Sequence, residues 1–108
     1  GSFVQDYESP CANGTKWGLF AWDASVPALG TLNFSVGTAS TSSKLNEAQM
    51  IPFVDGAQPP QVVQDYFAAN LNPEPYHNFL RVRVDMSMGS NRQSPMLNSF
   101  TVNWECLQ

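Results

Sequence analysis

The chain of 108 residues is long enough for one domain with a hydrophobic core and too short for two. Apolar residues make up 43% and charged residues only 13%, about half of the usual charged share. A formal net charge of -4 argues against the phosphate contacts that dominate nucleic-acid binding, and no apolar run approaches the roughly 20 residues of a membrane-spanning helix. We therefore expect one domain over residues 1–108, cut from a larger protein, with no nucleic-acid partner and no membrane insertion.

The first part of the chain predicts two strands after an irregular start. Residues 1–10 show no periodic pattern, so we expect an irregular entry segment that Cys11 ties down. The segment 17–22 is aromatic and apolar on both alternating faces, which favours a strand buried on both sides or near an edge. In 32–37 large apolar residues alternate with polar or small ones, which is the pattern of a half-buried strand, and a Ser/Thr-rich loop follows it.

The middle of the chain predicts helical structure. Residues 45–49 fit only a short helix, because prolines and a glycine follow closely. Residues 60–70 fit an amphipathic helix, with Pro60 in the first turn and Asn70 as the C-terminal cap. The residues that share its apolar face are Val62, Val63, Tyr66 and Phe67. We expect this helix to cover one end of a sheet.

The last third of the chain carries the clearest alternation. One apolar row comprises Leu80, Val82, Val84, Met86 and Met88. After a polar loop at 89–95, a second row comprises Met96, Phe100, Val102, Trp104 and Cys106. The two segments predict long strands, and their proximity in the sequence favours an antiparallel hairpin with a long loop.

The only two cysteines, Cys11 and Cys106, lie near opposite ends of the chain. We expect them to form a disulfide bond, since Cys106 lies in phase with the inward residues of the last strand. Such bonds persist in oxidising compartments, so the pair predicts a secreted or cell-surface protein. The alternative is two buried free thiols in a cytosolic protein, because cysteine is common in protein cores.

Several motifs together resemble a known class of domain. These are Cys11, Trp17-Gly18, Trp22-Asp23, the strand at 32–38, the Leu80 to Val84 strand, the segment Ser94 to Phe100, and Cys106. The combination resembles accessory β-sandwich domains of large bacterial extracellular proteins of the myxobacterial type, and the last part is similar to discoidin or galactose-binding-like jelly rolls. The resemblance implies an antiparallel, jelly-roll-like β-sandwich. The short helix and the proline-rich segment between 52 and 75 depart from the discoidin pattern.

Residues for catalysis or metal binding are scarce. His77 is the only histidine, no Gly-x-Ser-x-Gly elbow is present, and the carboxylates are scattered, so we expect no enzyme. Asp23 and Asp55-Gly56 are loop carboxylates of the kind that hold calcium in some sandwiches, although turn formation explains them more simply. We expect no resident cofactor, with calcium as the alternative.

The candidate ligand-binding residues are aromatic or polar. Trp and Tyr rings can stack on sugar rings, and the candidates are Trp17, Trp22, Tyr66 and Tyr76, the last with its neighbour His77. Of the tryptophans, Trp22 and Trp104 share a face with apolar residues and are expected in the core. A second candidate surface is the outward row of Arg81, Arg83 and Asp85, facing Thr101, Asn103 and Glu105 on the next strand. Cross-strand charge pairing is the alternative reading of that row.

These observations favour a non-catalytic extracellular binding or adhesion module that recognises a glycan or another surface polymer. The alternative is a structural or assembly domain of a surface appendage, pilus-associated or filament-forming, that contacts neighbouring protein domains. Concentration-dependent association without sugar binding would distinguish the second from the first.

Overall fold

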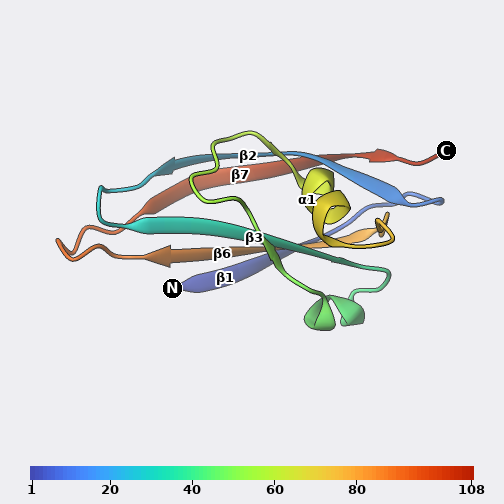
Figure 1. Ribbon diagram of the computed structural model, residues 1–108, viewed down its shortest axis with the longest axis horizontal. Helices are drawn as coiled ribbons and strands as arrows, with labels where there is room; N and C mark the ends of the chain where they lie inside the picture. Colours follow the sequence, from blue (N-terminus) through green and yellow to red (C-terminus); the bar gives the residue numbers. More distant parts are fainter.

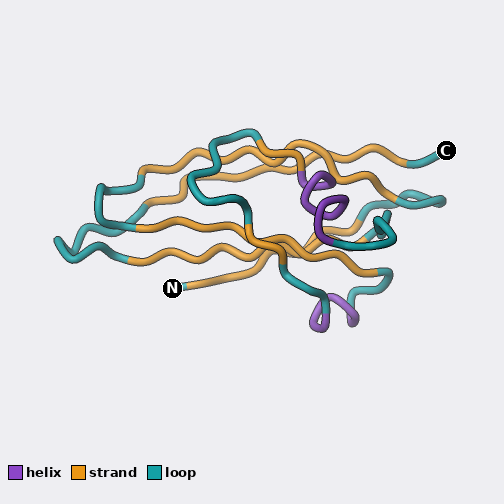
Figure 2. Tube along the Cα trace, viewed as in Figure 1, coloured by secondary structure: helices purple, strands orange, loops and turns teal.

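The computed structural model, which describes residues 1–108, is a sandwich of two antiparallel sheets (Figure 1). The first sheet contains, in order, β1 (Ser2–Glu8), β6 (Phe79–Ser87), β3 (Thr31–Ala39) and β4 (Ile51–Pro52). The second contains β5 (Gln61–Val62), β2 (Thr15–Ser25) and β7 (Met96–Cys106). The 3-10 helix η1 (Ser43–Glu47) and the helix α1 (Val63–Asn70) complete the fold, and Figure 2 shows both helices toward the same end of the molecule.

The predicted fold class is confirmed. The chain is mainly β, it has one α-helix, and Cys11 and Cys106 form a disulfide with a Cα to Cα distance of 5.2 Å. The predicted helix at 60–70 begins later than expected, at Val63, because Gln61 and Val62 pair with β2 as the short strand β5. The short helix expected at 45–49 is present as η1.

Two predictions about the strands were wrong. Residues 2–8 are not irregular, because they form β1 and pair along their whole length with β6. The last two strands do not form a hairpin, because they lie in opposite sheets. β6 inserts between β1 and β3, and β7 pairs with β2. The loop at 88–95 therefore crosses from one layer to the other. Leu80 to Met86 of the first apolar row and Phe100 and Val102 of the second contribute to the core between the layers, whereas Met88, Met96 and Trp104 at the ends of the rows are exposed.

The core lies between the sheets and beneath α1. It contains ten buried side chains: Trp17, Phe20, Phe34, Val36, Ile51, Val63, Phe67, Leu80, Val82 and Val84. Phe20 is its centre, since its ring lies 4.9 Å from that of Phe34, 5.4 Å from that of Phe53 and 5.7 Å from that of Phe100. Edge-to-face and tilted aromatic pairs at these distances add to the stabilisation that burial alone gives.

A β-bulge in β2 places its aromatic residues. The register shifts between Trp17 and Phe20, so that one additional residue of β2 lies opposite β7. Trp17, Phe20 and Trp22 therefore all face the core side, and Leu19 points outward and is exposed. The strand is thus covered mainly on one face. It is not buried on both sides, and the other expectation, a position near a sheet edge, fits β2, since only the two-residue strand β5 lies beyond it.

Candidate functional site

The loop that carries Tyr76 and His77 belongs to a polar network at the disulfide end of the sandwich. The carbonyl of Tyr76 accepts a hydrogen bond from the N–H of Thr15 at 3.0 Å, and the carbonyl of His77 accepts one from Nε1 of Trp17 at 2.9 Å. Next to them, Nδ2 of Asn78 donates to the carbonyl of Cys11 at 2.7 Å. The backbone of this loop is therefore fixed by the fold.

The side chains of this loop are more accessible than its backbone. The ring of Tyr76 is 39% exposed, and desolvation together with the neighbouring carboxylate of Glu74 raises the pKa of its hydroxyl group. His77 is half-buried. Tyr76 and His77 are thus adjacent, as the sequence requires, but neither lines the cleft between β2 and β3 or the cavity beside Leu19 and Pro60.

Two other predicted site residues are occupied by structural contacts. Trp17 is fully buried and packs edge to face on Trp104 with ring centroids 5.6 Å apart, so it presents no face to a ligand. Oδ1 of Asn103 accepts a hydrogen bond from the N–H of Leu19 at 2.7 Å and fills the space that the missing side chain of Gly18 leaves. Asn103 therefore supports the bulge of β2.

The predicted row of arginines lies on the outer face of the other sheet and does not face β7. Arg81 donates to both carboxylate oxygens of Asp6 on β1, at 2.8 and 3.0 Å, and its third contact is Oδ1 of Asn46 at 3.0 Å. The hydrogen bond from Arg81 lowers the pKa of Asp6. Arg83 pairs with Asp85 on its own strand at 3.1 Å. The expected pairing with Thr101, Asn103 and Glu105 was wrong, because β7 belongs to the opposite layer.

A cleft of about 600 Å³ lies at the side of the sandwich where β2 and β3 form the sheet edges. β4 pairs with only two residues of β3, and β5 with only two of β2, so both longer strands extend beyond their short neighbours. The segment from Phe53 to Pro59 crosses between these edges and closes one end of the cleft. The cleft thus occupies the space between the layers that no further strand covers.

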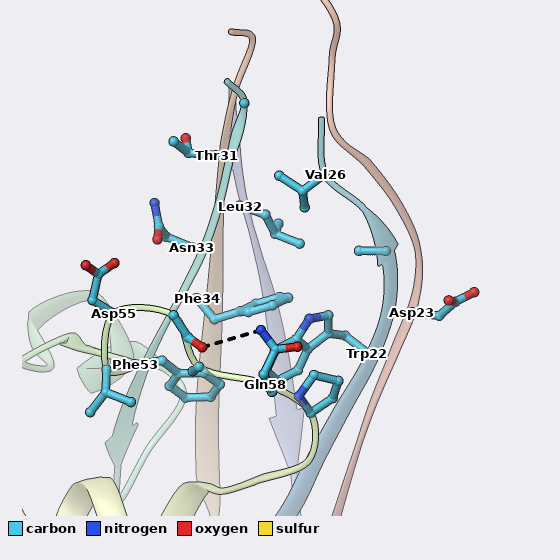
Figure 3. Close-up of a pocket in the computed structure, with 16 residues that line it drawn as sticks. Trp22, Asp23, Val26, Thr31, Leu32, Asn33, Phe34, Phe53, Asp55 and Gln58 are labelled. Carbon is cyan, nitrogen blue, oxygen red and sulfur yellow. Dashed lines mark hydrogen bonds between the residues drawn. The ribbon is translucent and has the colours of Figure 1, made fainter. Parts of the chain in front are cut away.

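The interior of the cleft is aromatic. Figure 3 shows Leu32, Phe34 and Trp22 pointing into the space between β3 and β2, with Phe53 below them. The ring of Trp22 lies 4.8 Å from that of Phe34 and 6.2 Å from that of Phe53. Trp22 and Phe53 are only half-buried, so part of each ring faces the cleft. Trp22, which we expected in the core, is thus packed on core residues and accessible at the same time.

Polar groups surround this aromatic surface. The amide of Gln58 lies over Trp22 and donates to the carbonyl of Gly56 at 3.4 Å, whereas Asn33 and Asp55 lie along the outer side of β3 (Figure 3). Asp23 points away on the β2 side. None of the lining residues carries a positive charge. Asp23 and Asp55 both line the cleft, and no group of three or more His, Cys, Asp or Glu side chains comes together anywhere in the molecule to hold a metal ion.

Comparison with protein families, curated protein sequences and solved structures gave no match. The resemblance to discoidin-like jelly rolls therefore remains a prediction. No helix of the molecule is long and apolar enough to cross a membrane. The disulfide indicates an oxidising compartment.

Proposed function

We propose that this protein is a non-catalytic extracellular binding module that recognises a glycan or a comparable surface polymer in the cleft between β2 and β3. The observation that carries the proposal is the combination of half-exposed Trp22 and Phe53 rings with the amide of Gln58 beside them and with Asn33 and Asp55 at the rim of the cleft. Binding pockets of this size are typically apolar inside, with a few polar groups that orient the ligand.

The chemistry of the cleft suits a sugar ring. The apolar face of a pyranose can lie against Trp22 or Phe53, and the amide of Gln58 can bond its hydroxyl groups. The carboxylate of Asp55 at the rim can bond the hydroxyl groups of a neighbouring sugar unit. The only charged groups that line the cleft are the carboxylates of Asp23 and Asp55, so the cleft favours neutral or cationic ligands over anionic ones. The disulfide supports the extracellular location, since it requires an oxidising environment.

The test is a glycan screen with and without calcium, followed by calorimetric titration of variants. Gln58→Ala and Asp55→Ala change exposed side chains and should keep the fold. Each should weaken binding about fivefold, which corresponds to the loss of one hydrogen bond of about 1 kcal/mol. The matched comparison is Tyr76→Ala in the loop that we predicted from the sequence, and it should bind like the parent.

The outcomes separate the sites. Weaker binding by Tyr76→Ala with normal binding by the cleft variants would assign the ligand to the Tyr76 loop. A screen without any bound glycan would reject the proposal in this form. The alternative function, a structural or assembly domain that contacts other protein chains, is favoured by a different observation, the exposed strand edges on the side of the sandwich opposite to the cleft.

A further inference from the structure

The second open side of the sandwich is formed by β1 and β7, the terminal strands of the two sheets. Phe3 of β1 and Phe100 of β7 approach each other there, with ring centroids 6.3 Å apart. Phe3 is 43% exposed and Trp104 is 41% exposed, although both side chains belong to the inward-facing rows of their strands. Aromatic residues of the core faces are thus open to solvent on this side.

The edge of β7 lacks the features that usually prevent strand association. Edge strands are commonly protected by short length, proline, lysine or inward charge. The cleft side follows this rule, because β4 and β5 have two residues each and prolines lie beside them. β7 has 11 residues, and it contains no proline, lysine or arginine. Its register with β2 shifts at Asn98, where β7 has the additional residue, and again opposite the bulge of β2 at Asn103, where the additional residue belongs to β2. Residues 99–106 of β7 therefore carry no bulge of their own and form a continuous edge.

The direction of the backbone groups along β7 follows from one hydrogen bond. The N–H of Leu107 donates to the carbonyl of Gly14 at 3.0 Å and so points toward β2. Because the backbone groups of an antiparallel strand alternate between its two sides, those of Trp104, Val102 and Phe100 point away from β2. No neighbouring strand lies on that side.

The charge distribution makes β7 the edge at which a second copy of this chain fits best. The chain carries a net charge of -4, so most approaches of two copies are repulsive. β7 carries a single carboxylate, Glu105, and Lys16 is its cross-strand neighbour on β2. The edge of β1 is less suitable, since it carries Asp6 and Glu8, and only Asp6 is paired with an arginine.

We propose that two copies of this chain associate through antiparallel pairing of their β7 edges, centred on Val102. In this register Val102 lies opposite its own copy, and Phe100 of one chain lies opposite Trp104 of the other. Residues whose backbone groups point to the open side then meet in pairs, as an antiparallel ladder requires. The two Glu105 side chains lie opposite Ser99, far from each other, and the aromatic pairs are of the kind that stabilises sheets.

The proposed interface does not depend on the proposed ligand, but it would make the binding module bivalent. The cleft lies at the β4 and β5 side of the sandwich and β7 at the other. A dimer through β7 therefore carries two clefts on its outer flanks. If the cleft binds a polymer, as proposed above, the second site binds at a raised effective concentration.

The first test is the oligomeric state of the parent protein over a dilution series, by sedimentation, with amide hydrogen exchange on the same samples. We expect a dimer that dissociates on dilution, and slower exchange of the Val102 and Trp104 amides in the concentrated sample. The matched control is the amide of Val4 on the free edge of β1, which should exchange rapidly throughout. A parent that stays monomeric, or a dimer that slows the Val4 amide instead, would overturn the proposal.

Two variants test the register. Val102→Pro removes an N–H that points to the open side and should give a monomer, whereas Val4→Pro does the same on β1 and should leave the dimer intact. If Val102→Pro does not fold, Val102→Cys decides the question, because directly opposed residues lie within disulfide distance. We expect a covalent dimer from Val102→Cys under mild oxidation and much less from Thr101→Cys. The reverse result would exclude this register.

Discussion

The buried amide of Gln64 connects three parts of the structure, and its removal should be the most costly single loss of polar contacts. Gln64 lies in the first turn of α1 and is 2% exposed. Its Oε1 accepts the N–H of Trp17 at 3.1 Å, and its Nε2 donates to Oε2 of Glu74 at 2.9 Å and to the carbonyl of Pro75 at 2.7 Å. β5 pairs only with Leu19 and Phe20, so the side chain of Gln64 takes the place of a neighbouring strand at Trp17.

The expected magnitude follows from the groups that would be left without partners. Gln64→Leu keeps the volume but leaves the N–H of Trp17 and the carbonyl of Pro75 without the amide. Each buried polar group without a hydrogen bond costs about 1 to 3 kcal/mol, so we expect the free energy of unfolding to fall by about 3 kcal/mol. For a domain of this size that corresponds to a melting temperature about 12 °C lower.

Urea denaturation with a matched control measures this loss. The control is Gln49→Leu, the same chemical change at an exposed glutamine, which should shift the urea midpoint very little. An unchanged slope in both variants would show that the surface exposed on unfolding is the same, so that the shift in midpoint reports stability. If Gln64→Leu unfolds at the midpoint of the parent, the amide does not have the role that its contacts indicate.

A second substitution at this position gives a pH signature. In Gln64→Glu the introduced carboxyl group lies near Glu74 and the carbonyl of Pro75, and burial and the like charge both raise its pKa in the folded state. Its pKa in the unfolded state is about 4.3. A raised folded pKa gives stability that is present below the unfolded pKa and is lost as pH rises. Gln64→Glu should therefore be closest to the parent in acid and fall behind it toward neutral pH.

Three further predictions concern the rest of the molecule. Replacing both Cys11 and Cys106 by Ser opens a disulfide-closed loop with a sequence separation of 95 residues and should lower the free energy of unfolding by about 4 to 5 kcal/mol. Thermal melting of the oxidised parent and the variant measures this loss, and equal melting temperatures would contradict it. Gly18→Ala should destabilise the fold, because a Cβ there would clash with Oδ1 of Asn103. An unchanged urea midpoint would contradict this and show that the bulge adapts. Arg81 lowers the pKa of Asp6 in the folded state, so the contribution of this carboxylate to stability is present above pH 3.8 and is lost as pH falls through the lower folded pKa. Because the Asp6 side chain is 44% exposed, this contribution to stability is below about 1 kcal/mol. Asp6→Asn should remove this part of the acid sensitivity.

The sequence predicts those parts of the fold in which one face of a strand is buried and the other is not. β3 and β6 follow this rule, and their alternating rows identified them. β7 follows it only in its middle, where Phe100 and Val102 are half-buried and the residues between and beside them are exposed. β1 does not, because six of its seven residues are exposed on an edge strand and the contrast between its faces is weak. The disulfide was predictable because the chain has only two cysteines.

The pairing of strands could not be predicted from the alternation. β6 and β7 each have a strong apolar row, and such rows fit two neighbours in one sheet as well as two strands that face each other across a core. The structure has the second arrangement, since β6 contacts β1 and β3 while β7 contacts β2. Which of the two arrangements forms depends on the strands that pair with β6 and β7, and these strands lie far away in the sequence.

The assignment of the aromatic residues changed for a local reason. Strict alternation from Trp17 would place Leu19 inward and Phe20 outward. The bulge at Gly18 and Leu19 reverses the phase, so that Trp17 and Phe20 are buried and Trp22 reaches the cleft. Only the Trp17-Gly18 dipeptide marks this point in the sequence, since a glycine inside a strand often indicates a bulge. The cleft itself forms where β2, β3 and the segment 53–59 meet, and no short motif contains all three.

The two open sides of the sandwich differ in a way that bears on function. On the cleft side, short strands and prolines end the sheets early, and the segment 53–59 limits the space to about 600 Å³, which suits a ligand of a few sugar units rather than a further protein layer. On the β7 side the edge is long and regular, and it carries little charge, which suits another strand. The polar residues that most resemble a binding site in the sequence, Asn103 and the Tyr76 loop, lie outside the cleft, and the fold uses the Asn103 side chain and the loop backbone for its own hydrogen bonds. Binding is thus expected where the fold leaves aromatic surface unused.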